Sequence, residues 1–122
     1  MKLKSTCTSH SAYLNNIDPR QTNYQHLCRS HAHPRHAIAL SFDTDLFIPG
    51  DLEGELHLND VPVIAAGPMQ TEQIANALQS RLIVILRGHG AYARGHNLWE
   101  ALHWVTALEE SAHIAWLRGQ RR

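Results

Sequence analysis

The stretch LIVILRGHG, residues 82–90, combines the clearest strand of the chain with a histidine that follows it. Residues 82–86 are all apolar and rich in β-branched side chains, which is typical of a buried strand. Gly88 and Gly90 flank His89, and glycine lets the backbone approach a neighbour closely or adopt positive φ. We therefore expect His89 to lie in a tight turn at the end of a buried strand.

A second histidine motif, His31-Ala32-His33, ends 56 residues before His89. Because successive side chains of a strand point to opposite faces, His31 and His33 share a face if this segment is a strand or the end of one. Three histidines at strand ends are a common way to hold a divalent metal ion with one position open for substrate. On spacing alone, surface or capping roles for the three side chains stay open as the alternative.

From residue 37 onward the sequence predicts alternating strands and helices. Strands are expected at residues 37–42, 61–64 and 82–86, and helices at residues 51–58, 71–80 and 97–118. Pro62 favours an edge position for the strand at 61–64, because proline cannot donate to a ladder. Asn97 is a suitable N-cap for the long helix, and Glu100 three residues later resembles a capping box. This order of elements predicts a mixed α/β sandwich.

The composition suits one globular domain. The chain has 122 residues, and its 11 basic and 11 acidic residues balance, which argues against binding to nucleic acid or to a membrane. No apolar run is long enough to span a membrane, and no apolar signal segment follows the first residues. Cys7 and Cys28 form neither a CxxC pair nor a disulfide framework, so we expect a reduced, cytoplasmic protein.

Residues 1–30 differ from the rest, since they are polar and show no sustained period. We expect them to form an irregular N-terminal arm, either loosely held or ordered by docking on a partner. Residues 31–122 are then the core of the protein.

Three motifs, in order, resemble those of one known family. Residues 31–41, HAHPRHAIALS, resemble the HTHSPYATALS segment of the class II aldolase/adducin family, and residues 83–95, IVILRGHGAYARG, resemble its VLLRNHGxxxxG segment. The sequences NLWEA at 97–101 and ALEESA at 107–112 resemble the helix of that family. The resemblance covers roughly residues 26–118, with Gly88 where the family has asparagine.

For the core, residues 31–122, this resemblance implies an αβα sandwich around a mostly antiparallel sheet. It also implies a divalent metal ion, usually zinc, held by His31, His33 and His89. Family members cleave, epimerise, decarboxylate or dehydrate small sugar phosphates, and the metal acts as a Lewis acid on a carbonyl or enediolate oxygen. They are typically homotetramers with sites at subunit interfaces.

The chain departs from the family before the first histidine pair. Family enzymes carry a longer segment there than these 30 residues, with phosphate-binding loops and a carboxylate that serves as ligand or acid/base. Asp18 is the one acidic residue among residues 1–30, and its surroundings match no family pattern. The interpretation is a shortened family domain that keeps the metal-binding half and lacks the phosphate-binding half.

The sequence thus predicts a metal-binding class II aldolase-like protein, a lyase or isomerase acting on a small hydroxy-carbonyl or sugar-phosphate compound, with its acid/base unidentified. The alternative is a catalytically inactive oligomeric binding module or a truncated remnant of the family. Trp99, Trp104 and Trp116 cannot all face one stripe of a helix, and exposed tryptophans favour a homo-oligomer. The expected partners are a small-molecule substrate and further copies of the chain.

Several residues near the motifs have more than one interpretation. His36 is expected to pack or to hydrogen-bond a neighbouring group rather than to be a fourth ligand. Tyr92 either faces the site or packs, while Arg87 and Arg94 meet an anion, form salt bridges or are solvated. The carboxylates of residues 43–55 are expected to be solvated, although one of the glutamates could replace the lost family carboxylate; they are Asp43, Asp45, Glu53 and Glu55.

Overall fold

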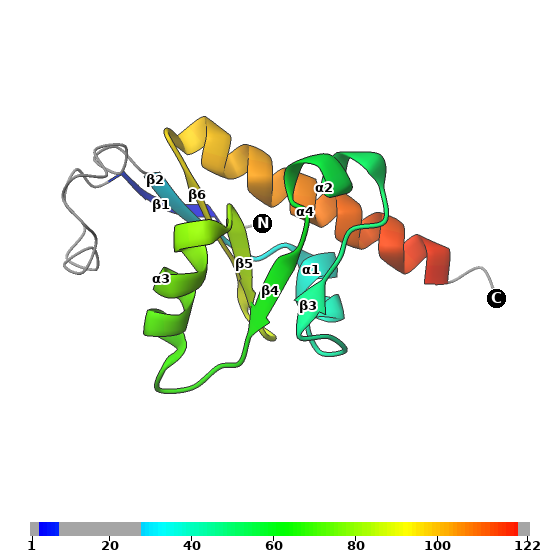
Figure 1. Ribbon diagram of the computed structural model, residues 1–122, viewed down its shortest axis with the longest axis horizontal. Coiled ribbons are helices and arrows are strands. Elements are labelled where there is room, and N and C mark those ends of the chain that lie inside the picture. Colours follow the sequence, from blue (N-terminus) through cyan, green and yellow to red (C-terminus); the bar gives the residue numbers. More distant parts are fainter. Residues whose placement is uncertain (1–2, 8–27, 120–122) are drawn as a thin grey trace.

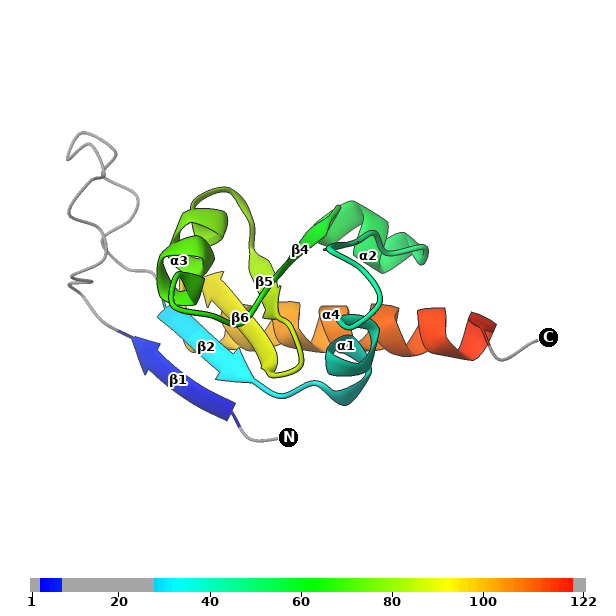
Figure 2. The same ribbon diagram turned by 90° about the horizontal axis from the view of Figure 1, so that it is seen from below.

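A computed structural model describes residues 3–7 and 28–119 of the chain as a sandwich of helices around one sheet (Figure 1, Figure 2). The strands are β1 (Leu3–Cys7), β2 (Cys28–Ala32), β3 (Leu46–Phe47), β4 (Val61–Ile64), β5 (Ile83–Leu86) and β6 (Gly90–Gly95). The helices are α1 (Arg35–Leu40), α2 (Leu52–His57), α3 (Gln70–Ser80) and α4 (Leu98–Gly119).

The sheet has the strand order β1-β2-β6-β5-β4-β3 and is mostly antiparallel. Only β4 and β5 run parallel among the pairings of the described strands. Helix α4 lies along one face together with α1 and α2, and α3 covers the other face (Figure 2). The αβα sandwich around a mostly antiparallel sheet is therefore confirmed.

Strand β5 faces both hydrophobic cores of the sandwich. All four of its residues are buried. Ile83 and Ile85 belong to the core that contains Leu108 of α4, while Val84 and Leu86 belong to the core under α3. The alternation of strand side chains thus explains why a continuous apolar run was needed here.

The strand expected at residues 37–42 is wrong, because this segment lies in α1 and the loop after it. Pro34 stands at the N-cap with φ −71°, which is compatible with entry into a helix. Ala37 and Ala39 favour the helix. Glu109 of α4 accepts a hydrogen bond from the His36 backbone N–H at 2.8 Å, which satisfies a donor of the first turn. An apolar run as short as residues 37–40 fits the period of a strand as well as that of a helix. The contact with α4 favours the helix.

The edge position expected for β4 is also wrong, since the two-residue strand β3 lies outside it. The Val63 backbone N–H donates to the Asp45 carbonyl at 2.9 Å, on the β3 side, so the nitrogen of Pro62 faces β5 instead. The pairing of β4 with β5 begins at Val63, past the proline. The ladder between β4 and β5 thus starts after the one residue of β4 that has no N–H to donate.

The other helices of the core are confirmed to within a residue or two of their expected bounds. Asp51 caps α2, and its side chain accepts a hydrogen bond from the Gly54 N–H at 3.1 Å. Within the described part of the chain, no helix combines the length and the apolar character needed to cross a membrane.

The N-terminal region contains more structure than the sequence indicated. Strand β1 pairs antiparallel with β2, and β2 begins at Cys28, before the expected core boundary. Residues 8–27, most of the expected arm, lie outside the described residues. Cys28 is disulfide-bonded, and Cys7 is its register partner in β1, which differs from the reduced state expected from the sequence.

Candidate metal centre

His31, His33 and His89 meet at one end of the central strands and are called the histidine cluster below. His31 lies in β2, His33 directly follows that strand, and His89 lies in the turn between β5 and β6. Because β6 runs antiparallel to both of its neighbours, its start lies beside the end of β2 and the end of β5. The sheet therefore brings together two motifs that are remote in sequence.

The ring nitrogens of the cluster converge. The Nε2 atom of His31 lies 3.0 Å from Nε2 of His33 and 3.1 Å from Nε2 of His89. Candidate ligand atoms of all three residues lie within 4.8 Å of one another. Among the described residues, these three histidines are the one group of three or more His, Cys, Asp or Glu side chains with such a geometry.

The ring of His31 is fixed by strand β6. Its Nδ1 lies 3.0 Å from the Ala91 carbonyl, so Nδ1 carries the proton and donates it, which leaves the lone pair of Nε2 directed at the cluster. Tyr92, the register partner of His31, stacks on its ring with centroids 4.2 Å apart and an interplanar angle of 23°. Burial raises the pKa of the Tyr92 hydroxyl. Tyr92 thus packs against the cluster as a neutral aromatic ring.

The two glycines around His89 meet different requirements. A Cβ at Gly90 would lie 2.3 Å from the Ala32 carbonyl oxygen and 2.8 Å from Cδ2 of His33, so this position has no room for a side chain. Gly88 has φ +71°, in the left-handed region that glycine adopts without strain. The β5–β6 turn can therefore pack closely against β2, with His89 beside His31.

The donor set fits a divalent transition metal. Zn–N bonds of about 2.0–2.1 Å at tetrahedral angles place neighbouring ligand nitrogens roughly 3.4 Å apart, close to the separations within the cluster. Three neutral imidazoles suit zinc, copper, nickel and iron better than the hard cations calcium and magnesium. Within the described residues no carboxylate joins the cluster, so Glu53 and Glu55 do not replace the family carboxylate there.

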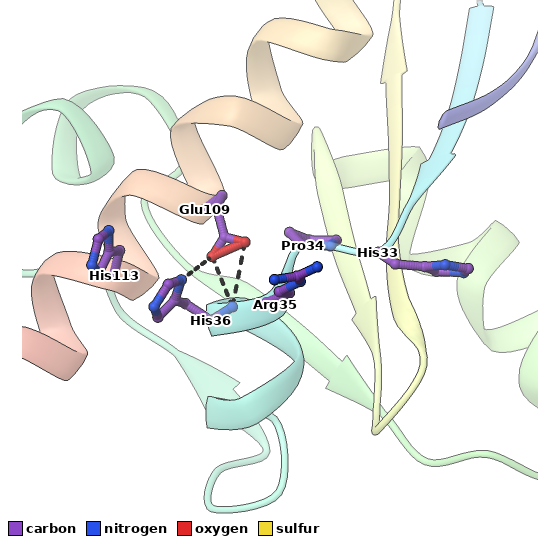
Figure 3. A pocket seen from close by; sticks show the side chains of 6 residues that line it. All are labelled: His33, Pro34, Arg35, His36, Glu109 and His113. Carbon is purple, nitrogen blue, oxygen red and sulfur yellow. Dashed lines mark hydrogen bonds and ion pairs between the residues drawn. The ribbon is translucent and has the colours of Figure 1, made fainter. Parts of the chain in front are cut away.

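His36 lines a pocket of about 260 Å³ together with Glu109 and His113, and His33 of the cluster lines the same pocket (Figure 3). Its Nδ1 is 3.1 Å from Oε1 of Glu109, and its ring stacks on His113 with centroids 4.0 Å apart. In Figure 3 the His33 side chain extends to the opposite side of Pro34 and Arg35 from His36. His36 therefore packs and hydrogen-bonds as expected, and it stands apart from the cluster.

The two arginines of the second motif are engaged within the chain. Arg87 forms an ion pair with Asp45 and donates from Nε to the Ser41 carbonyl at 2.9 Å. Arg94 donates from Nε to the Arg81 carbonyl at 2.9 Å. Arg87 thus forms the salt bridge that was one of its alternatives, whereas Arg94 is hydrogen-bonded to a backbone carbonyl.

Sequence reasoning missed strand β6 and with it the Ala91 carbonyl that orients His31. The segment GAYARG begins and ends with glycine, which reads as loop. Its alternation of buried Ala91 and Ala93 with half-buried Tyr92 and Arg94 was the available signal.

Comparisons with known proteins agree with this fold. A sequence model described as the class II aldolase and adducin N-terminal domain matches residues 2–116. The structure of L-fuculose-1-phosphate aldolase from Thermus thermophilus is similar with a TM-score of 0.71 and 40% identity over 75% of this chain. A second L-fuculose 1-phosphate aldolase matches 88% of this chain with a TM-score of 0.69 and 24% identity, which supports the fold.

YgbL from Klebsiella pneumoniae matches 78% of this chain with a TM-score of 0.67 and 25% identity. The matched parts cover 52%, 52% and 50% of the three solved chains, so this chain spans about half of their length. No curated protein matches the sequence.

Proposed function

The chain belongs to the class II aldolase and adducin family, and we propose that its histidine cluster holds one divalent metal ion, most simply zinc. The observation that supports this most directly is the convergence of three Nε2 atoms, two of whose separations are 3.0 and 3.1 Å. Imidazoles in such an arrangement leave a tetrahedral position open to a further ligand.

The proposed activity is that of a lyase or isomerase on a small hydroxy-carbonyl or sugar-phosphate compound. A metal bound there supplies Lewis-acid stabilisation of a carbonyl or enediolate oxygen during cleavage or isomerisation. The residues of the chain contribute orientation: the Ala91 carbonyl holds the tautomer of His31, and Tyr92 packs on one face of its ring. The acid or base that moves a proton is not assigned to a residue of this chain.

The first compound to assay is L-fuculose 1-phosphate, since an aldolase named for it is 40% identical over 75% of this chain. The matched part covers 52% of that enzyme. The assay therefore uses the full 122-residue chain, in whatever oligomeric state it has in solution. We include a homo-oligomer in the proposal because Trp99 and Trp116 of α4 are 78% and 50% exposed, and aromatic side chains are enriched at interfaces.

The metal site is tested by elemental analysis of the purified protein. We expect about one zinc per chain, and a loss of most of it in His31→Ala, His33→Ala and His89→Ala. His103→Ala is the matched control, because His103 is exposed on α4 and outside the cluster. The proposal is wrong if the purified protein contains no divalent metal and takes none up on reconstitution.

The second candidate is a catalytically inactive oligomeric module. It is favoured because no carboxylate of the described residues joins the three histidines. It predicts that the mass in solution is unchanged by a chelator and that no sugar phosphate is turned over. Turnover that is lost with the metal and restored with it decides for the enzyme.

A further inference from the structure

The β5–β6 turn, which carries His89, is hydrogen-bonded to a loop that lies more than 40 residues earlier in the chain. This loop comprises residues 41–45 and is called the 41–45 loop below. The Gly88 N–H donates to Ser41 Oγ at 2.9 Å. Arg87 donates from Nε to the Ser41 carbonyl at 2.9 Å and from Nη2 to the Thr44 carbonyl at 3.3 Å. Both residues that precede His89 are therefore bonded to this loop, although His89 itself is exposed.

Ser41 is fully buried, and its hydroxyl acts both as a hydrogen-bond donor and as an acceptor. It donates to the Ile38 carbonyl of α1 at 2.6 Å and accepts from the Gly88 N–H at 2.9 Å. Gly88 is exposed, so loss of this hydrogen bond costs about 0.5–1.5 kcal/mol and frees its N–H to turn toward water or another partner. Ser41 thus links the last turn of α1 directly to the turn before His89.

Gly88 has little freedom to move once it is bonded to Ser41. A Cβ at this glycine would lie 3.1 Å from two ring atoms of Phe42, so the aromatic ring covers one side of it. Its φ of +71° sets the direction in which the chain enters His89. The bond to Ser41, the Phe42 ring and the positive φ together fix where the His89 Cα stands.

The same loop is tied to the other histidine motif through α1. His33 precedes Pro34, the N-cap of α1, and Ser41 is the C-cap of that helix. One short helix therefore connects His33 at its start with the acceptor of the Gly88 N–H at its end. The distance between the two halves of the cluster depends on this connection as well as on the sheet.

We propose that Ser41 is a positioning residue for the metal centre: it holds His89 at ligand distance from His31 and His33 through the Gly88 N–H, with Arg87 as its support. The inference rests on the proposed metal site. Residues that orient a metal ligand from outside typically change metal affinity 10–100-fold when they are removed. Ser41→Ala deletes the acceptor and leaves all three histidines in place.

The test is the zinc dissociation constant, measured by competition with a chromophoric chelator, and the visible spectrum of the cobalt(II)-loaded protein. We expect Ser41→Ala to weaken zinc binding at least tenfold and to shift the cobalt bands toward those of His89→Ala. Ser111→Ala is the matched control, because Ser111 is 1% exposed on α4 and its hydroxyl has no hydrogen-bond partner among the described residues. A merely structural effect of Ser41 would lower the unfolding temperature without changing the cobalt bands.

A second pair of variants covers the case in which Ser41→Ala does not fold. Arg87→Lys keeps the charge that faces Asp45 but loses the Nε bond to Ser41, and we expect zinc binding to weaken about threefold or more. Arg94→Lys removes an equivalent Nε–carbonyl bond at 2.9 Å on β6 and should leave zinc affinity unchanged.

The outcomes separate the two proposals. Wild-type protein that binds neither zinc nor cobalt ends the proposed function itself. Wild-type protein that binds metal, together with Ser41→Ala or Arg87→Lys variants that bind it equally well with the same cobalt spectrum, overturns the positioning role alone.

Discussion

Gly90 stands where the backbone of β6 passes closest to the histidine cluster. The Ala32 carbonyl oxygen and His33 Cδ2 both lie within 3 Å of the place that a Cβ would occupy, at 2.3 and 2.8 Å. The first of these atoms belongs to the backbone of β2 and cannot rotate away. Any side chain at this position must therefore separate β2 from β6 or displace His33.

We predict that Gly90→Ala destabilises the fold by about 1–3 kcal/mol, the usual cost of overpacking, and weakens zinc binding in the same variant. Urea unfolding and chelator competition measure the two effects. Gly67→Ala is the matched control, because no atom of the described part of the chain lies within 4 Å of its Cβ position. Equal stability of the two variants would show that β2 and β6 approach less closely than described.

At the start of α4, the side chains of Asn97 and Glu100 each accept a hydrogen bond from a backbone N–H. Asn97 Oδ1 accepts from the Glu100 N–H at 2.9 Å, so the predicted N-cap is confirmed. Glu100 reaches back past Asn97 and accepts from the His96 N–H at 2.8 Å. This bond lowers the pKa of the Glu100 carboxyl, with smaller contributions from the His96 side chain and the charge of Arg94.

Glu100→Gln should therefore cost stability in a pH-dependent way. A carboxyl whose pKa is lowered in the folded state stabilises above its unfolded pKa, near 4.5, and loses that contribution as the pH falls through the folded value. We expect a loss under about 1 kcal/mol at neutral pH, because solvent screens this site, and none near pH 2. Urea unfolding at both pH values gives the comparison; a loss of equal size at both would contradict it.

The elements that could be predicted from the sequence are those with one long, unambiguous pattern. Residues 82–86 and the stripe of α4, with its buried Ala101, Val105 and Leu108, were recognisable because burial repeats at a single period. The segment at 37–42 was not, since four apolar residues fit a strand or a helix and its first turn depends on Glu109, 73 residues away from His36. Local sequence carries no information about such a contact.

The candidate site was predicted in part. The HxH and GHG motifs, together with the resemblance to the family, predicted that the three histidines meet, and the structure places them together. The groups that fix them were not foreseen: Ser41 and Ala91 act through a hydroxyl and a backbone carbonyl, neither of which has a distinctive spacing. Their roles depend on the order of strands in the sheet.

At the scale of the whole molecule, stability depends on the core between the sheet and α4. Leu108 is fully buried there, in a cluster that includes residues of the sheet and of α1. Leu108→Ala should cost about 3 kcal/mol, from lost burial and the cavity left behind. Trp99→Ala, at a side chain that is 78% exposed on the same helix, should change the free energy of unfolding by less than about 0.5 kcal/mol.

Urea unfolding over a range of protein concentrations compares the two variants and separates the stability of the single chain from that of any assembly. A small loss for Leu108→Ala would mean that α4 is held mainly by its neighbours in an assembly and not by its own core.

The position of β6 between β2 and β5 has a consequence for the order of events during synthesis. His31 and His33 leave the ribosome early, but the carbonyl that sets the tautomer of His31 belongs to residue 91, 60 positions later. A nascent chain that ends before β6 contains the three histidines, but it lacks the carbonyl that orients His31. The proposed metal site is therefore complete only once β6, the last strand of the sheet along the chain, is in place.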